Sequence, residues 1–265
     1  MVLELSLKEK SVLVTGGNRG IGLAIALAFA DEGANVAICG RDQAALATAK
    51  SAIEERGVKA HTIAADLFTA AGCEAAIKET ADTFGSFHVL VSNASTNIGG
   101  TLETLTDDQA IERVMGKTLA AMRLSRAALP HLRAAGGGRI ICIGGTAART
   151  PGKTSLPSGL GNSSLVNFVK HFSNDVGPEN ITVNVVHPPF TKTDRYPARL
   201  EARAAQLGVS LAEAEASFAA DFPIGRIVEP ADIAPMVLFL ASPHAAAITG
   251  QAIAVDGGST QMVTY

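Results

Sequence analysis

The sequence predicts an α/β protein, a single domain of 265 residues built on a doubly wound parallel sheet with helices on both faces. Two observations predict this class. Short, continuously apolar runs alternate with longer helical patterns, which is typical of buried parallel strands joined by crossover helices. The first such run, Val12–Val14, leads directly into a glycine-rich turn, Thr15–Gly22, and then into the helical pattern Ile21–Glu32. Right-handed crossovers between such units place a ligand crevice at the carboxyl ends of the strands.

The remaining elements follow the same alternation. Strand patterns lie at Asn35–Cys39, Ala60–Ala64, Val89–Ser92, Arg139–Ile143, Ile181–Val186 and Ala252–Val255. Helical patterns lie at Gln43–Arg56, Ala70–Phe84, Asp107–Ala134, Leu156–Val176 and Ala231–Ala241. One segment, 188–222, is long and carries a charged, alanine-rich helical pattern. Because loops beyond the carboxyl ends of strands build the crevice, we expect a substrate lid here, the alternative being a pair of surface helices.

The composition narrows the class of partner. With 47% hydrophobic residues the chain can bury a large core, and its net charge of −3, with no basic run, argues against nucleic acid. No apolar stretch is long enough to span a membrane and no signal peptide is recognisable, so we expect a cytoplasmic protein. The thiols Cys39, Cys73 and Cys142 show no paired spacing and are expected to be reduced and mostly buried. No cluster of side chains has metal-ligand spacing, so no metal is predicted.

The glycine-rich turn indicates a phosphate-binding site of the Rossmann type. Gly16, Gly20 and Gly22 remove side chains where the backbone must turn and approach a pyrophosphate. The helix that follows directs its N–H groups and positive dipole end at that anion. The strand–turn–helix context makes the pattern specific and predicts a dinucleotide ligand.

Further motifs extend this pattern along the chain. Asp66 follows the third strand in AADL, Asn93 follows the fourth in SNAS, and the C-terminal part reads ITGQAIAVDGGS. From about Leu7 to Ser259 the chain resembles the short-chain dehydrogenase/reductase family. The resemblance implies a nicotinamide dinucleotide, a small-molecule substrate and a homotetramer or homodimer. The positions that match the family's cofactor-binding residues are Thr15, Gly16, Asn18, Arg19, Gly20, Ile21, Gly22, Asp66, Leu67, Asn93, Ala94, Pro188 and Thr193.

The end of the second strand favours NADP(H) over NAD(H). An NAD enzyme usually carries an acid there to bind the ribose 2′-hydroxyl, but this chain reads Cys39-Gly40-Arg41. The guanidinium of Arg41 can hold a 2′-phosphate through its forked donors, with help from Arg19. The alternative is a solvated Arg41 beside an Asp42 that caps the next helix.

The residues that perform catalysis in the family are changed in this chain. The family uses an Asn, a Ser, a Tyr and a Lys, with the Tyr as the proton donor. Aligned on the surrounding motifs, Lys117 stands at the Asn position, Gly145 at the Ser, Ser158 at the Tyr and Asn162 at the Lys. An aliphatic hydroxyl has a pKa far above that of a phenol, so we do not expect carbonyl–alcohol interconversion through the usual tetrad.

Three functions remain open. In the first, an atypical reductase of a carbonyl or enoyl compound uses another acid, with Lys117 first and His187 and Tyr196 as further candidates. In the second, the subunit binds NADP(H) as a sensor or scaffold without turnover. In the third, Ser158 acts with Lys117 or Lys153 as a lyase or hydrolase pair. Lys117 as a solvated lysine and His187 as a strand cap are the structural alternatives. The predicted lid also carries Arg195, Arg199 and Arg203, which fit either an anionic substrate or spaced surface charges.

Overall fold

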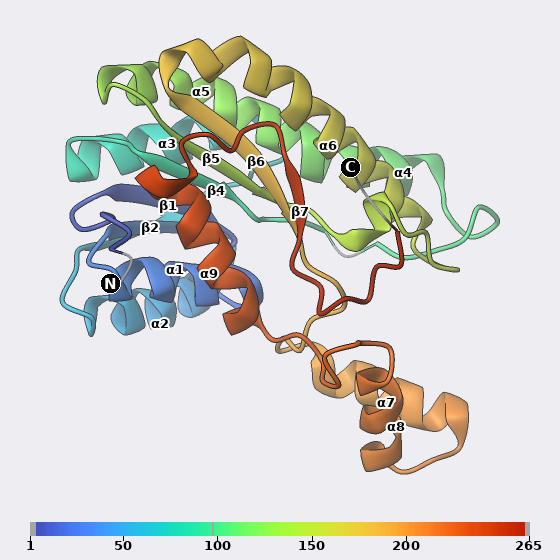
Figure 1. Ribbon diagram of the computed structural model, residues 1–265. Coiled ribbons are helices and arrows are strands. Elements are labelled where there is room, and N and C mark those ends of the chain that lie inside the picture. Colours follow the sequence, from blue (N-terminus) through green and yellow to red (C-terminus); the bar gives the residue numbers. More distant parts are fainter. Residues whose placement is uncertain (1–3, 97, 263–265) are drawn as a thin grey trace.

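The computed structural model describes residues 4–96 and 98–262, and within them seven parallel strands form one sheet (Figure 1). The strands are β1 (Ser11–Thr15), β2 (Asn35–Gly40), β3 (Ala60–Ala64), β4 (Val89–Ser92), β5 (Gly138–Ile143), β6 (Ile181–His187) and β7 (Ala252–Ala254). Their order is β3-β2-β1-β4-β5-β6-β7, and every neighbouring pair is parallel. The direction of winding therefore reverses between β1 and β4, and a ligand crevice is expected at their carboxyl ends.

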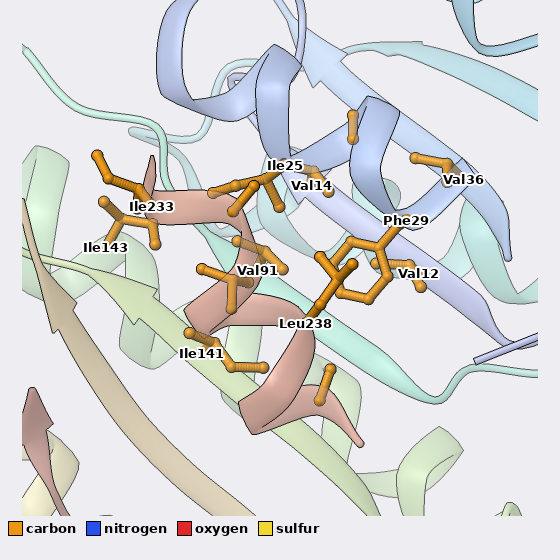
Figure 2. Close-up of a cluster of buried hydrophobic side chains, with 14 of the residues drawn as sticks. Val12, Val14, Ile25, Phe29, Val36, Val91, Ile141, Ile143, Ile233 and Leu238 are labelled. Carbon is orange, nitrogen blue, oxygen red and sulfur yellow. The ribbon is translucent and has the colours of Figure 1, made fainter. Parts of the chain in front are cut away.

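Helices cover both faces of the sheet, as the sequence predicts. They are α1 (Gly20–Asp31), α2 (Gln43–Glu54), α3 (Ala70–Phe84), α4 (Asp107–Val114), α5 (Ala120–Ala134), α6 (Leu156–Val176), α7 (Tyr196–Leu207), α8 (Leu211–Ala219) and α9 (Pro230–Ala241). One buried cluster joins the sheet to α1, α2 and α9, and Figure 2 shows Phe29 and Leu238 meeting in it. A second cluster, which includes Leu90, Leu124 and Val183, lies under α3, α5 and α6. Each large side chain removed from water in this way contributes about 1.5–3 kcal/mol.

The predicted helix Asp107–Ala134 is interrupted. Its middle, Met115–Leu119, forms a π-helical turn between α4 and α5, with Gly116, Lys117 and Thr118 buried. A π-helical turn has a wider repeat than an α-helix and rotates the side chains that follow it. The Thr118 hydroxyl donates to the Gly161 carbonyl at 3.0 Å, which ties the turn to α6. The interruption therefore brings a short polar segment to the inner side of the helix layer.

The segment 188–222 holds α7 and α8, which pack on each other and project beyond the carboxyl ends of the strands (Figure 1). Ser210 begins α8 with a reciprocal capping arrangement, in which its side chain accepts from the Glu213 N–H while the Glu213 carboxylate accepts from the Ser210 N–H. The segment thus forms a helix pair, the alternative to the predicted lid, and a role as a lid stays a prediction. In the described residues, no helix combines the length and apolar character that a membrane span requires.

Candidate functional site

A groove of about 450 Å³ lies at the carboxyl ends of β1, β2 and β4. Twelve of the fourteen residues predicted to bind a cofactor line it, and only Thr15 and Pro188 do not. The twelve are Gly16, Asn18, Arg19, Gly20, Ile21, Gly22, Arg41, Asp66, Leu67, Asn93, Ala94 and Thr193. The fold therefore gathers residues from distant parts of the chain into one hollow.

Thr15 lies beneath the groove and positions its wall. Its hydroxyl oxygen accepts from the N–H groups of Asn93 at 2.8 Å and Ala94 at 2.9 Å, and the Asn93 amide donates to the Thr15 carbonyl at 2.9 Å. The glycines leave space that side chains would fill. A Cβ on Gly22 would lie 2.2 Å from the carbonyl oxygen of Gly16, and Gly16 itself has a φ of 65°. This backbone cradle fits a pyrophosphate at the start of α1.

Two exposed arginines flank the groove near the end of β2. Arg19 and Arg41 both line it, and neither forms an ion pair with another described residue. The adjacent carboxylate of Asp42 is engaged elsewhere, because it accepts from the Ala45 N–H at 3.1 Å and caps α2. Arg41 thus presents its N–H donors at the edge of the groove, where its positive charge could pair with a 2′-phosphate.

On the other side of the groove the structure brings an unpredicted residue, Arg113, to Ser158. Arg113 lies in the last turn of α4, and its guanidinium donates to Ser95 Oγ at 2.5 Å, to the Thr96 carbonyl and to Ser158 Oγ at 3.3 Å. The side chain is 7% exposed. One feature of the sequence could have pointed to Arg113 as a site residue: it lies four residues before Lys117, and residues four apart share a helix face.

Lys117 is buried rather than solvated, with 5% of its surface exposed. Burial lowers its pKa to about 7, and the charge of Arg113 contributes in the same direction, while Cys142 opposes it. In the part of the chain that the structure describes, the Lys117 ammonium group makes no hydrogen bond and no ion pair with another residue. An amine that titrates near neutrality is suited to proton transfer.

Gly145, Asn162 and His187 fit together at the ends of β5 and β6. A Cβ on Gly145 would lie 2.8 Å from the Asn162 amide nitrogen, so the missing side chain makes room for this asparagine. The Gly145 N–H donates to His187 Nδ1 at 2.9 Å, the strand-end contact considered from the sequence. Burial, together with the charges of Arg149 and Lys117, lowers the His187 pKa to about 4. The neutral ring therefore carries its proton on Nε2, which is buried without a partner in the described structure, as is Asn162 Oδ1.

The candidates from the helix pair lie in a separate cluster. Tyr196 packs with Phe190 and Phe218, and no contact joins it to Ser158, Asn162 or Lys117 among the described residues. Tyr196 is therefore not brought into the crevice in this conformation.

Of the three arginines that fit either an anionic substrate or spaced surface charges, Arg195 lines the groove and the other two are placed elsewhere. Arg199 lies over the ring of Phe190 and Arg203 over that of Phe218, so both arginines help to hold the helix pair together. Lys153 is exposed and has no contact with Ser158 in the described structure. Within the described ranges, no group of three or more His, Cys, Asp or Glu side chains is placed to hold a metal ion.

The three cysteines, Cys39, Cys73 and Cys142, are free and buried, as expected. Burial raises the thiol pKa of Cys39 and of Cys142 to about 12 and that of Cys73 to about 11. A thiol with so high a pKa carries little thiolate at neutral pH, so all three are packing residues.

Comparisons with known proteins match nearly the whole chain. A family model described as enoyl-(acyl carrier protein) reductase covers residues 16–260. A putative ketoacyl reductase of Streptomyces coelicolor is 33% identical over 248 residues, which is 93% of this chain and 95% of that protein. The L-sorbose reductase of Gluconobacter frateurii, solved with NADPH and L-sorbose, superposes with a TM-score of 0.94 at 30% identity, covering 98% of this chain and 100% of that one. A variant of the actinorhodin polyketide ketoreductase, solved with NADPH, superposes with a TM-score of 0.90 at 31% identity over 97% and 99% of the two chains.

Proposed function

Because the chain belongs to the short-chain dehydrogenase/reductase family, we propose that it is an NADP(H)-dependent reductase of a carbonyl or enoyl compound that works without the family's usual tyrosine and lysine. The observation that carries the proposal is the groove, which unites the glycine turn, the Asp66 loop and the Asn93 segment with an unpaired arginine at position 41. Relatives solved with NADPH, such as the L-sorbose reductase, support the choice of cofactor.

Different residues of the groove would bind different parts of the cofactor. The glycine turn and the first N–H groups of α1 would hold the pyrophosphate, and Arg41 with Arg19 would hold the 2′-phosphate. Thr193 lies across the groove, since a Cβ on Gly20 would be 3.4 Å from its methyl carbon. When bound there, the nicotinamide would supply the hydride.

The protein must then stabilise the negative charge that develops on the substrate oxygen and donate a proton to that oxygen. Lys117 is our candidate acid, because its pKa of about 7 allows an ammonium to give up a proton at neutral pH. A preorganised cation also stabilises a developing enolate or alkoxide in a site shielded from water. Both the carbonyl and the enoyl reaction are compatible with this group, whereas the Ser158 hydroxyl alone is too weak an acid. The helix pair of segment 188–222 would act as the lid over this reaction.

A titration followed by a substrate panel tests the proposal. NADPH fluorescence should shift on binding, and oxidation of NADPH at 340 nm should appear with some ketones or enoyl thioesters. We expect Lys117→Met to keep NADPH affinity within about threefold and to lose about 10²–10⁴ in turnover. Lys153→Met, which removes an exposed lysine, is the matched control and should keep full activity.

The outcomes separate the three functions. Binding without oxidation across the panel would favour the non-catalytic sensor or scaffold. A protein that binds neither NADP⁺ nor NADPH at millimolar concentration would favour the lyase or hydrolase instead. Full turnover in Lys117→Met would remove Lys117 from the mechanism while leaving the reductase in place.

A further inference from the structure

Arg113 is a buried cation whose donors meet only neutral groups. It is 7% exposed, and its partners are the Ser95 and Ser158 hydroxyls and the Thr96 carbonyl. Its Nε is buried without a partner in the described structure and lies beside Gly161, where a Cβ would be 3.6 Å away. Nη1 donates to the groove wall at Ser95 and Thr96, and Nη2 faces Ser158 on helix α6.

The surroundings of Arg113 hold further positive charge. Lys117, one turn later and 5% exposed, is close enough that the charge of Arg113 helps to lower its pKa. Arg149 and Lys117 both act on His187 in the same direction, so three cations share this end of the crevice.

No acid in the described structure balances these cations. None of the ion pairs between described residues includes Arg113, Lys117 or Arg149. The segments 93–96, 144–150, 155–162 and 187–193 contain no Asp or Glu, and the acids that line the groove, Asp42, Asp66 and Asp194, form no ion pair with these cations in the described structure. A buried charge is ordinarily paired, because removing it from water without a counter-charge costs several kcal/mol.

From this arrangement we propose that Arg113 and Ser158 form a seat for a carboxylate of the substrate, which makes the substrate class a small oxo acid or its enoyl equivalent. The inference rests on the proposed reductase function and deepens it. A carboxylate that accepts from Nη2 and from the Ser158 hydroxyl supplies the missing negative charge. Arg113 is then a specificity-determining residue, while Lys117 keeps the role of acid at the oxo group.

The seat differs from the site of the cofactor phosphates. Arg41 and the glycine turn lie at the β1 and β2 end of the groove, whereas Arg113 joins the Ser95–Thr96 segment to α6. The proposal therefore predicts that Arg113 affects the binding of oxo acids and leaves the binding of NADP⁺ unchanged.

Calorimetry with matched pairs of ligands tests this prediction. The probes are pyruvate, acetoacetate and levulinate, each compared with its methyl ester, added to the protein saturated with NADP⁺. We expect at least one acid to bind the natural protein at least tenfold more tightly than its ester. In Arg113→Met this ratio should fall to below threefold while the Kd for NADP⁺ changes less than twofold. Arg126→Met, which removes an exposed arginine from α5, is the control and should keep the natural ratio.

Three results would overturn the seat: acids that bind no better than esters to the natural protein, an undiminished ratio in Arg113→Met, or a loss of NADP⁺ affinity above tenfold in that variant. The first needs no variant, so a folding defect in Arg113→Met does not protect the proposal. The reductase function is judged separately by NADPH oxidation. If esters are reduced as well as acids, the reductase function holds and the carboxylate seat is wrong. If acids bind through Arg113 but NADPH is not oxidised, the seat holds and the reductase function is wrong.

Discussion

The two ends of the crevice are built by different means. The end at β1 and β2 relies mainly on backbone. It consists of glycines with no room for a Cβ, the N–H groups of α1, and a buried Thr15 that holds the segment after β4. The end at β5, β6 and α6 relies on residues whose side chains fit their neighbours: Asn162 fills the space that Gly145 leaves, and Arg113 donates to Ser158. A backbone cradle tolerates little change and stays recognisable, whereas a side-chain constellation can be exchanged as a set. The two ends should therefore respond to different substitutions: an added Cβ disturbs the first, and an exchange of paired residues alters the second.

The largest expected effect lies in the backbone cradle. Gly22→Ala places a Cβ 2.2 Å from the Gly16 carbonyl oxygen and 2.5 Å from the Asn93 amide nitrogen, so the turn must move. We expect NADPH affinity, measured by calorimetry, to fall at least about 100-fold, or about 2.7 kcal/mol. Gly177→Ala is the matched control, since nothing lies within 4 Å of its added Cβ. Unchanged affinity in Gly22→Ala would mean that the cradle is not the binding element.

The second prediction concerns the pH dependence that buried Lys117 imposes on stability. Its pKa is about 7 in the fold, against 10.5 for an ordinary lysine side chain. Between these values the unfolded chain binds the additional proton, so the free energy of unfolding rises with pH, by up to about 1.4 kcal/mol per pH unit. Below pH 7 Lys117 is charged in the fold as well, so the full cost of burying its ammonium lowers the free energy of unfolding.

Lys117→Met removes that dependence. The variant should be more stable than the natural protein at pH 7, and the gap should shrink by about 2–3 kcal/mol by pH 9. Urea unfolding at pH 7, 8 and 9 measures it, with Lys153→Met as the exposed control. A gap that stays constant with pH would show that Lys117 titrates normally in the fold.

The third prediction tests whether the side-chain end acts as a set. Gly145→Ser brings a Cβ to 2.8 Å from the Asn162 amide nitrogen, and overpacking of this kind costs about 1–3 kcal/mol. In an Asn162→Ala background the same change should cost less than about 0.5 kcal/mol. A double-mutant cycle by urea unfolding gives the coupling energy. Additive effects would separate Gly145 from Asn162 and weaken the contrast between the two ends.

The smallest expected effect concerns the exposed cation at the groove's edge. Arg41→Ala should lower NADPH affinity about tenfold, which is about 1.4 kcal/mol, and leave NADH affinity within twofold, because only the former carries the 2′-phosphate. Lys59→Ala, an exposed lysine outside the groove, serves as the control. Equal losses for the two cofactors would assign Arg41 a role other than phosphate recognition, and salt should reduce the NADPH effect if the assignment holds.

Local pattern was enough to predict most of the fold and the cofactor groove. Strands such as Val89–Ser92 and Asn35–Cys39 are continuous apolar runs, and glycines at fixed spacing specify a backbone turn that side chains cannot form. The break in Asp107–Ala134 was missed, because a π-helical turn differs from an α-helix by one inserted residue and keeps a helical composition.

The sequence by itself determined the doubly wound sheet, the glycine turn and the absence of a tyrosine from α6, since each depends on residue type and short-range spacing. Tertiary structure decided which charges face the crevice. From the sequence, Arg195, Arg199 and Arg203 fitted either an anionic substrate or spaced surface charges. In the structure Arg195 lines the groove, while Arg199 and Arg203 stack on aromatic rings. Arg113, in contrast, reaches Ser158 across 45 positions of the chain. Burial and contact between distant segments set the pKa of Lys117 and the partners of Arg113, and no local pattern carries that information.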